Sequence, residues 1–273
     1  MSYATLAPFY DLENADFVAD LDFWVSLARE ANSPVLELGC GSGRVTQQIA
    51  RAGINIVGLD NSPDMLALAR AKLDRNPKIA ALVTLVEGDM TNFEISNPQP
   101  HASRPHSTLP HSHTPTPQFS LIIVPFNTFM HLLTPADQLA MLGCAHKHLC
   151  PGGQLILDLT NPIPAYADPP QETLTLERAF RDDARDLTIQ QFSTLRIDRA
   201  AQIAHIVYYY DSLASDGTLK RALVPLTLRY TFPAEMSLLL DRAGFKLAHL
   251  YGDYSETPFD EDSERMIVMA EAV

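Results

Sequence analysis

The sequence predicts an α/β fold whose sheet is mostly parallel, with an antiparallel last strand and an inserted antiparallel β flap. Three observations carry this prediction. Short apolar runs alternate with helical patterns along most of the chain. A turn of three alternating glycines, Gly39, Gly41 and Gly43, directly follows the first apolar run. Apolar and polar residues then alternate between 173 and 231, which is typical of paired strands. We expect one domain over 1–273, beginning with an N-terminal arm and helix in 1–30.

Composition limits the kind of protein. The chain has 273 residues, 46% of them hydrophobic, and no long uncharged apolar run, so we expect one substantial core and no membrane partner. Its start lacks a basic region followed by an apolar one, which predicts a cytoplasmic protein. With 20 Lys and Arg against 33 Asp and Glu, the formal charge is -13, which is unfavourable for binding nucleic acid. We expect a monomer or homodimer. The three cysteines match neither a disulfide framework nor a zinc site.

The first strand and its turn indicate a nucleotide site. The run from Val35 to Leu38 reads as a buried strand, and a helix begins near Arg44. A dinucleotide fold would require its last glycine at position 44, where this chain has arginine. The glycine spacing therefore excludes the usual pyrophosphate fingerprint.

The second strand supplies an acid at the expected place. A helix that ends at Gly53 is followed by an apolar strand, 54–59, which finishes at Asp60. Asp60 lies 21 residues after Gly39, where nucleotide-binding folds place the acid that accepts hydrogen bonds from ribose hydroxyls. A chance acid at the strand end is the alternative, and the spacing favours the ribose role.

The remaining elements follow in the order that a parallel sheet requires. Helices are expected at Asp16–Arg29, from Ser62 to Pro77, after Thr134, and from Pro233 to Gly244. Strands are expected at Leu82–Val86, Phe119–Val124, Leu155–Leu159, Phe245–Tyr251 and Arg265–Ala270. A Pro151-Gly-Gly153 turn precedes the strand Leu155–Leu159, and a hairpin turn is expected at Asp216-Gly217 in the flap.

Residues 96–118 interrupt this pattern. They hold three pentads that open with His and close with Pro, and almost nothing apolar. We expect a disordered surface insertion. Its four histidines could bind a metal, but ligands on a disordered tether are poorly preorganised, so we predict no metal site.

Several of these segments together resemble the class I S-adenosylmethionine-dependent methyltransferases. The resemblance rests on Glu37 with its three glycines, on Glu87-Gly-Asp-Met90, on Cys150-Pro-Gly-Gly153 before a strand, and on Tyr10-Asp11 ahead of the first helix. It implies a Rossmann-like sheet and S-adenosyl-L-methionine as cofactor, with Asp89 at the adenine amino group and Met90 at the ring. The residues it implies for cofactor binding are Tyr10, Glu37, Gly39, Cys40, Gly41, Gly43, Asp60, Asn61, Met65, Asp89, Met90, Pro125 and Asn127.

Residues for the methyl acceptor are less distinct. Met130-His131-Leu132 is similar to the Gly-His-Leu of aminosugar N-methyltransferases, with Met in place of Gly. That similarity implies His131 as a base or substrate contact, and the alternative is a packed or capping histidine. Asp253, Tyr251 and Tyr254 follow the sixth strand and are expected at the acceptor, the alternative being a polar turn with packed rings.

The predicted function is S-adenosylmethionine-dependent methyl transfer to a small-molecule nucleophile, with an amine as one possibility. One alternative is methylation of a macromolecule, tRNA or protein, which the acidic composition and the flap disfavour. The other is a protein that binds the cofactor without turnover, since motifs report binding alone.

The insertion gives a first testable prediction. Replacing 96–118 with a short Gly-Ser linker should leave cofactor affinity and melting temperature nearly unchanged, because the segment has no apolar face to bury. Calorimetry and thermal melting check this, and a large loss in either would show a structural or metal-binding role.

Overall fold

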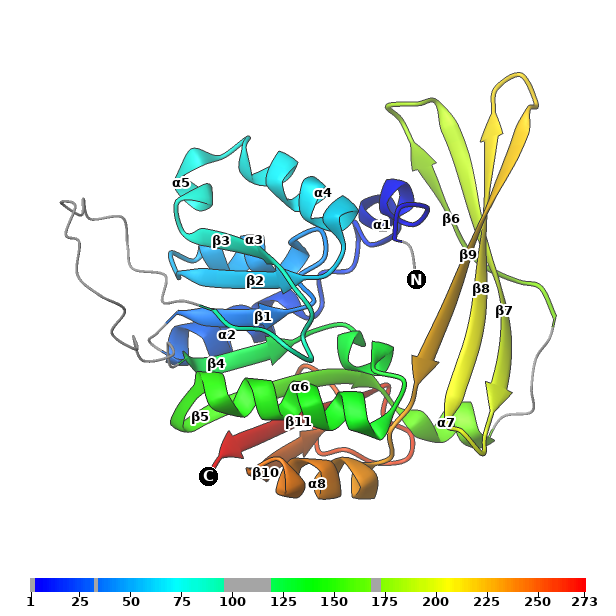
Figure 1. Cartoon of the computed structure of the whole chain (residues 1–273). Helices are drawn as coiled ribbons and strands as arrows, with labels where there is room; N and C mark the ends of the chain where they lie inside the picture. The colour runs from blue at the N-terminus through cyan, green and yellow to red at the C-terminus, as the bar shows by residue number, and fades with distance from the viewer. Residues whose placement is uncertain (1–2, 32–33, 96–118, 168–172) are drawn as a thin grey trace.

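The computed structural model describes residues 3–31, 34–95, 119–167 and 173–273 (Figure 1). Its main feature is a seven-stranded sheet with the order β10-β11-β5-β4-β1-β2-β3. Strands β1 to β5 run parallel, and β11 is antiparallel to both β5 and β10. The predicted mostly parallel sheet with an antiparallel last strand is therefore confirmed. The strands are β1 Val35–Leu38, β2 Ile56–Asp60, β3 Val83–Glu87, β4 Phe119–Val124, β5 Leu149–Thr160, β10 Phe245–Tyr251 and β11 Arg265–Ala272.

Helices pack on both faces of this sheet. One buried cluster joins Leu36 and Leu38 of β1 to α6 and α8, whereas Val35 belongs to a second cluster with α2 and α3. Successive residues of a strand point to opposite faces, so β1 contributes to two apolar layers. The helices are α1 Ala7–Glu13, α2 Leu21–Ala31, α3 Arg44–Arg51, α4 Pro63–Leu73, α5 Pro77–Ala80, η1 Thr128–His131 (3-10), α6 Pro135–His148, α7 Pro162–Ala167 and α8 Pro233–Arg242.

Capping residues set the helix starts as predicted in two cases. Ser62 accepts a hydrogen bond from the Met65 amide at 3.3 Å, and Thr134 accepts one from the Asp137 amide at 3.1 Å. Several boundaries differ from the sequence prediction. Strand β2 begins at Ile56 rather than at Ile54, and α4 ends at Leu73 rather than at Pro77. Helix α2 begins at Leu21 rather than at Asp16, and β5 begins at Leu149, so the predicted Pro-Gly-Gly turn lies within an irregular part of that strand.

The flap is a separate four-stranded antiparallel sheet in the order β6-β7-β8-β9, which confirms the predicted insertion (Figure 1). Helix α1 packs on it, and Phe9 stacks on Tyr210 with ring centroids 4.3 Å apart. The predicted hairpin turn is present, since Gly217 has φ 85° between β8 and β9. The flap strands are β6 Thr175–Asp182, β7 Leu187–Asp198, β8 Ile203–Ala214 and β9 Leu219–Arg229.

Two features are absent from the described ranges. None of the helices in them is long and apolar enough to cross a membrane. The same ranges contain no group of three or more metal-ligating side chains. The predicted His- and Pro-rich insertion, 96–118, lies outside the described residues.

Candidate active site

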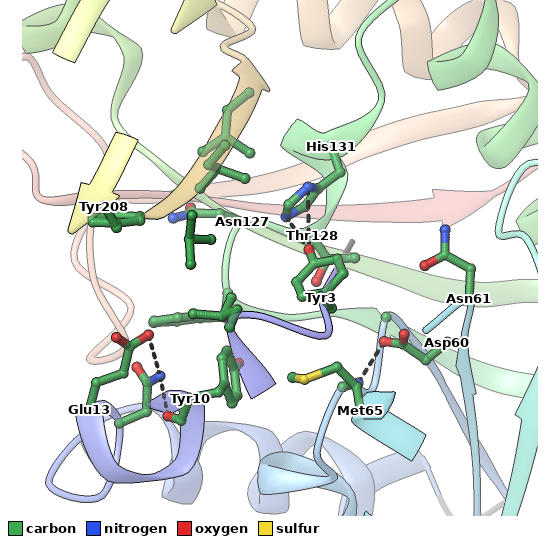
Figure 2. A pocket seen from close by; sticks show the side chains of 18 of the residues that line it. Tyr3, Tyr10, Glu13, Asp60, Asn61, Met65, Asn127, Thr128, His131 and Tyr208 are labelled. Atoms are coloured by element: carbon green, nitrogen blue, oxygen red, sulfur yellow. Dashed lines mark hydrogen bonds between the residues drawn. The ribbon is translucent and has the colours of Figure 1, made fainter. Parts of the chain in front are cut away.

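A cavity of about 390 Å³ lies beyond the carboxyl ends of the parallel strands, between the main sheet and the flap. Figure 2 shows Asp60, Asn61 and Met65 at one end and Glu13 with Tyr208 at the other, with His131 and Tyr3 between them. Because β1 and β4 are adjacent while the chain continues from β1 to β2 on the opposite side, the cavity lies where the strand order reverses. Of the predicted cofactor residues, those that line it are Tyr10, Gly39, Gly41, Asp60, Asn61, Met65, Met90 and Asn127.

The glycine turn lets the backbone approach this cavity. Gly39 has φ 70°, and a Cβ there would lie 2.2 Å from the Thr128 Cγ2 atom. Gly41 has φ 55° and lines the cavity. A side chain at Gly39 would therefore be strained and would also collide with the loop after β4.

Asp60 is held by the turn that it faces. Its Oδ2 accepts a hydrogen bond from the Gly41 amide at 2.8 Å, and its Oδ1 accepts one from the Ser62 amide at 2.8 Å. Burial raises the pKa of Asp60, and these two amides lower it. An ionised carboxylate accepts about four hydrogen bonds, so each oxygen retains capacity for a ribose hydroxyl.

Three predicted residues support the turn from behind the cavity wall. Glu37 is fully buried and accepts a hydrogen bond from Thr46 Oγ1 at 2.5 Å. Cys40 is buried against Gly58, and Gly43 packs on Ala69 with φ 77°. Glu37, Cys40 and Gly43 thus fix the shape of the loop and do not line the cavity.

Burial raises the pKa of Glu37 to about 8 from its ordinary 4.5. Between these two values the folded protein keeps a proton that the unfolded chain has released. Stability from this group is fully present below pH 4.5 and is lost as pH rises through 8. We predict that Glu37→Gln reduces the fall in unfolding free energy across this window.

Urea unfolding over a pH series measures that effect. Glu87→Gln, at an exposed position on the edge strand β3, is the control, and its stability should follow the wild-type pH curve. Identical pH curves for wild type and Glu37→Gln would contradict the prediction.

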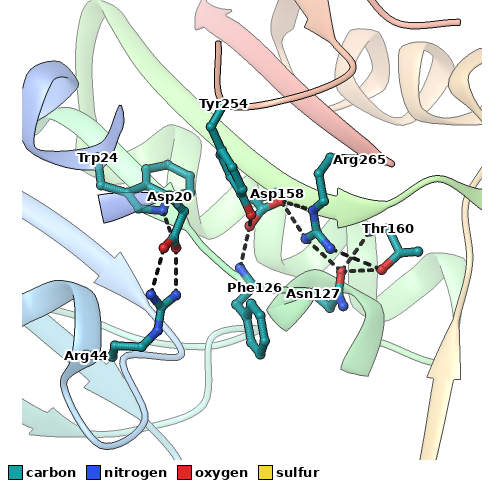
Figure 3. Close-up of polar contacts among 9 residues, drawn as sticks. All are labelled: Asp20, Trp24, Arg44, Phe126, Asn127, Asp158, Thr160, Tyr254 and Arg265. Atoms are coloured by element: carbon teal, nitrogen blue, oxygen red, sulfur yellow. Dashed lines mark hydrogen bonds and ion pairs between the residues drawn. The ribbon is translucent and has the colours of Figure 1, made fainter. Parts of the chain in front are cut away.

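The loop after β4 is fixed by the buried carboxylate of Asp158 (Figure 3). Asp158 Oδ2 accepts hydrogen bonds from the Phe126 amide at 2.9 Å and from the Tyr254 hydroxyl at 3.0 Å. Its Oδ1 accepts two hydrogen bonds from Arg265, one from Nε at 2.8 Å and one from Nη2 at 2.5 Å. Phe126 and Asn127 have φ values of 53° and 64°, so this network holds two left-handed residues against the cavity. Pro125, a predicted cofactor residue, is buried just before them and does not line it.

Arg44, which replaces the glycine of the dinucleotide fingerprint, joins the N-terminal arm to the same loop. Its guanidinium makes a bidentate ion pair with buried Asp20, at 2.7 and 2.6 Å, and Trp24 Nε1 donates to that carboxylate at 3.0 Å (Figure 3). The guanidinium carbon also lies 5.0 Å from the Phe17 ring centroid and 5.4 Å from that of Phe126. Arg44 therefore has a structural role, connecting Asp20 and Phe17 to Phe126 of the loop after β4.

His131 faces the cavity from the end of η1. The Tyr3 hydroxyl lies 3.1 Å from its Nε2 and 3.5 Å from its Nδ1. Burial lowers the pKa of His131 to about 4, and burial raises the pKa of Tyr3. Both groups are therefore uncharged at neutral pH, and the neutral imidazole has one unprotonated nitrogen. The tautomer decides whether the Tyr3 hydroxyl donates to that nitrogen or accepts from the ring N–H.

Other predicted positions lie elsewhere. Asp89 is exposed, and its Oδ1 accepts hydrogen bonds from the Thr91 amide and hydroxyl at 2.8 Å. Asp253 Oδ1 accepts from the Ser255 amide at 2.8 Å and belongs to its own turn. Neither Asp89 nor Asp253 lines the cavity, and the same holds for Tyr251 and Tyr254.

Contact of Tyr251, Asp253 and Tyr254 with the acceptor therefore stays a prediction, and none of the three lines the cavity. Tyr251 ends β10, and Asp253 and Tyr254 follow it, at the same sheet edge as the cavity. However, β10 is the outermost strand, separated from β4 by β11 and β5. Tyr254 instead donates to Asp158, and Tyr251 stacks on His249 with centroids 5.4 Å apart.

The structure also adds residues that the sequence prediction missed. Tyr3 and Glu13 come from the N-terminal arm, and Phe126 and Thr128 come from the loop after β4. The flap contributes Glu177, Arg178, Gln191, Tyr208, Val224, Leu226 and Leu228. Val224, Leu226 and Leu228 alternate along β9 and so share one face of the flap. The sequence shows this alternation but not which face of the flap meets the cavity.

Comparison with known proteins defines the class. Residues 36–155 match the family model described as a methyltransferase domain. The cypemycin N-terminal methyltransferase of Streptomyces sp is 27% identical over 93% of this chain and 89% of its own. Two solved structures share the fold. The CcbJ methyltransferase of Streptomyces caelestis has a TM-score of 0.74 at 24% identity, over 95% of this chain and 98% of its own. The S-adenosylmethionine-bound CalS10 of Micromonospora echinaspora, an amino pentose methyltransferase, has a TM-score of 0.68 at 18% identity. The match covers 100% of this chain and 98% of CalS10.

Residues 36–155 thus match a methyltransferase domain, and the chain has the class I methyltransferase fold. Together with the cypemycin enzyme, these similarities support an S-adenosylmethionine-dependent methyltransferase. The methyltransferase family model and the S-adenosylmethionine-bound neighbour support the predicted cofactor, S-adenosyl-L-methionine. The cavity fits this group, because the glycine turn leaves its wall open at Gly41 and Asp60 offers carboxylate oxygens beside it.

Proposed function

We propose that the enzyme methylates the nitrogen of a small-molecule amine. The observation that carries this proposal is one cavity shared by the Asp60 loop, His131 and the flap, so the acceptor and the cofactor would be enclosed together. The cypemycin enzyme and the amino pentose enzyme support an amine, since their names specify a peptide N-terminus and an amino sugar.

Within this proposal, S-adenosylmethionine supplies an activated methyl group, and the protein supplies orientation and a dry site. Asp60 holds the ribose hydroxyls, while Gly41 and Met65 shape the adjoining wall. His131 lies in the cavity as a neutral imidazole and accepts the proton that an attacking amine must lose. Leu226 and Leu228 on the flap help to exclude water.

The experiment is methyl transfer from S-adenosylmethionine carrying a radiolabelled methyl group to panels of amines, phenols and sugars. The proposal expects label in amines, located on nitrogen by mass spectrometry. Label confined to phenols or sugars would contradict nitrogen as the acceptor, and no label in any panel would favour a binding protein without turnover.

A peptide amine is a second candidate, favoured by the similarity to the cypemycin enzyme over most of both chains. Short peptides with free and acetylated N-termini distinguish it. Transfer to the free peptides at rates above the small amines would favour this second function. No separate observation favours tRNA, which the net charge of -13 disfavours.

A further inference from the structure

The flap end of the cavity is acidic. Glu13 from α1 and Glu177 from β6 both line it. Arg178 is the single lysine or arginine among the described residues that line the cavity, and it is exposed. Its Nη1 donates to the Glu13 backbone oxygen at 2.9 Å, and no hydrogen bond joins it to the Glu13 carboxylate in the described structure. The two carboxylates therefore lack a directly bonded cation.

The contacts of Glu13 leave hydrogen-bonding capacity. Its Oε2 accepts from the Tyr210 hydroxyl at 2.6 Å and from Gln191 Nε2 at 3.0 Å. Its Oε1 accepts a longer contact from Asn14 Nδ2 at 3.3 Å. Burial raises the pKa of Glu13 although Tyr210, Arg178 and Asn14 lower it, so a further cation in the cavity would favour the ionised carboxylate.

Groups near Glu13 would also interact favourably with a cation. Gln191 is 3% exposed, and its Oε1 has no hydrogen-bond partner among the described residues. The Tyr208 ring lines the cavity near Glu13 (Figure 2), and an aromatic face attracts an ammonium group. Glu177 Oε1 accepts a hydrogen bond from Ser193 Oγ, which fixes the second carboxylate.

We propose that Glu13 and Glu177, with the Tyr208 ring, bind a second cationic group of the acceptor, an alkylammonium, at the end of the cavity away from Asp60. This inference rests on the proposed amine N-methylation, because it describes the far end of the same acceptor. A carboxylate in this place would face two negative side chains. An apolar group would make no hydrogen bond or ion pair with the half-buried Glu13 carboxylate.

Three probes of equal chain length test this subsite. Putrescine presents an ammonium at its second end, butylamine a methyl group and γ-aminobutyrate a carboxylate. Each is titrated calorimetrically into protein saturated with S-adenosylhomocysteine. A charge-assisted hydrogen bond in a partly buried site predicts that putrescine binds roughly tenfold or more tightly than butylamine, with γ-aminobutyrate weakest. Equal affinity of putrescine and butylamine would overturn the proposal.

Variants assign the preference to residues. Glu13→Gln and Glu177→Gln should each reduce the ratio of putrescine to butylamine affinity. Asp183→Asn removes the same charge from an exposed flap position outside the cavity and should retain the ratio. Glu177 is exposed and can be changed without loss of fold if Glu13→Gln fails to fold. A ratio unchanged in Glu177→Gln, or lost equally in Asp183→Asn, would overturn the assignment.

Failure of this inference is distinguishable from failure of the proposed function. A putrescine preference that Glu177→Gln removes supports the subsite even if no labelled methyl reaches nitrogen, and that result would contradict the proposed reaction. Transfer to nitrogen without any preference among the three probes supports the reaction and overturns the subsite.

Discussion

Asp60→Ala is expected to weaken binding of S-adenosylmethionine and S-adenosylhomocysteine by about 1.5–3 kcal/mol, roughly 10- to 150-fold in Kd. Both oxygens of Asp60 are oriented by amides of the surrounding loops, Gly41 and Ser62, at 2.8 Å. The carboxylate is thus held in place before the ribose binds, and little ordering is required on binding. Titration calorimetry with each nucleotide measures the loss.

Two controls separate this effect from a disturbed loop. Asp64→Ala removes the same charge from an exposed position in the first turn of α4, and its nucleotide affinity should match wild type. Asp60→Asn keeps one acceptor oxygen and should lose less affinity than Asp60→Ala. Unchanged affinity in Asp60→Ala, or NAD bound more tightly than S-adenosylmethionine by wild type, would contradict the assignment.

The sheet could be predicted from sequence because its signals are local. Each buried strand is a short apolar run, and caps such as Ser62 and Thr134 mark where helices begin. The predicted start of α2 was wrong because tertiary contacts hold the preceding residues. Phe17 fits the helical period, but its carbonyl accepts a hydrogen bond from Arg44 Nη1 at 3.1 Å and its ring packs on Phe126, so the chain is not helical there.

Site residues at the ends of the parallel strands could be predicted from the sequence, whereas residues that long-range packing brings to the cavity could not. Asp60 ends β2, Met90 follows β3, and both line the cavity at the carboxyl ends of these parallel strands. Asp253 follows a strand that ends at the same edge, but its distance along that edge depends on strand order, which no local pattern specifies. Tyr3 and Glu13 reach the cavity because α1 packs between the flap and α4, and that packing is long-range. The polar cavity residues of the flap were missed for the same reason.

His131→Ala is expected to lower the methylation rate by about 100-fold on a verified acceptor, with little change in S-adenosylmethionine affinity. General-base assistance acts in the transition state and contributes roughly 10²–10⁴-fold. Because burial lowers the pKa of His131 to about 4, the imidazole is already unprotonated at neutral pH. The wild-type rate should therefore show no step from this group near pH 6.5, the ordinary pKa of histidine.

The alternative for His131 is a packed histidine, and the same variant distinguishes the two. A packing role predicts a lower melting temperature together with an intact rate, whereas the proposed role predicts the reverse. His249→Ala, at an exposed position on β10, is the matched control and should retain the wild-type rate. Tyr3→Phe keeps the ring but removes the hydroxyl 3.1 Å from His131 Nε2, so a rate loss in this variant would show that the pair acts together. A normal rate in His131→Ala would show that the amine loses its proton to water or binds already deprotonated.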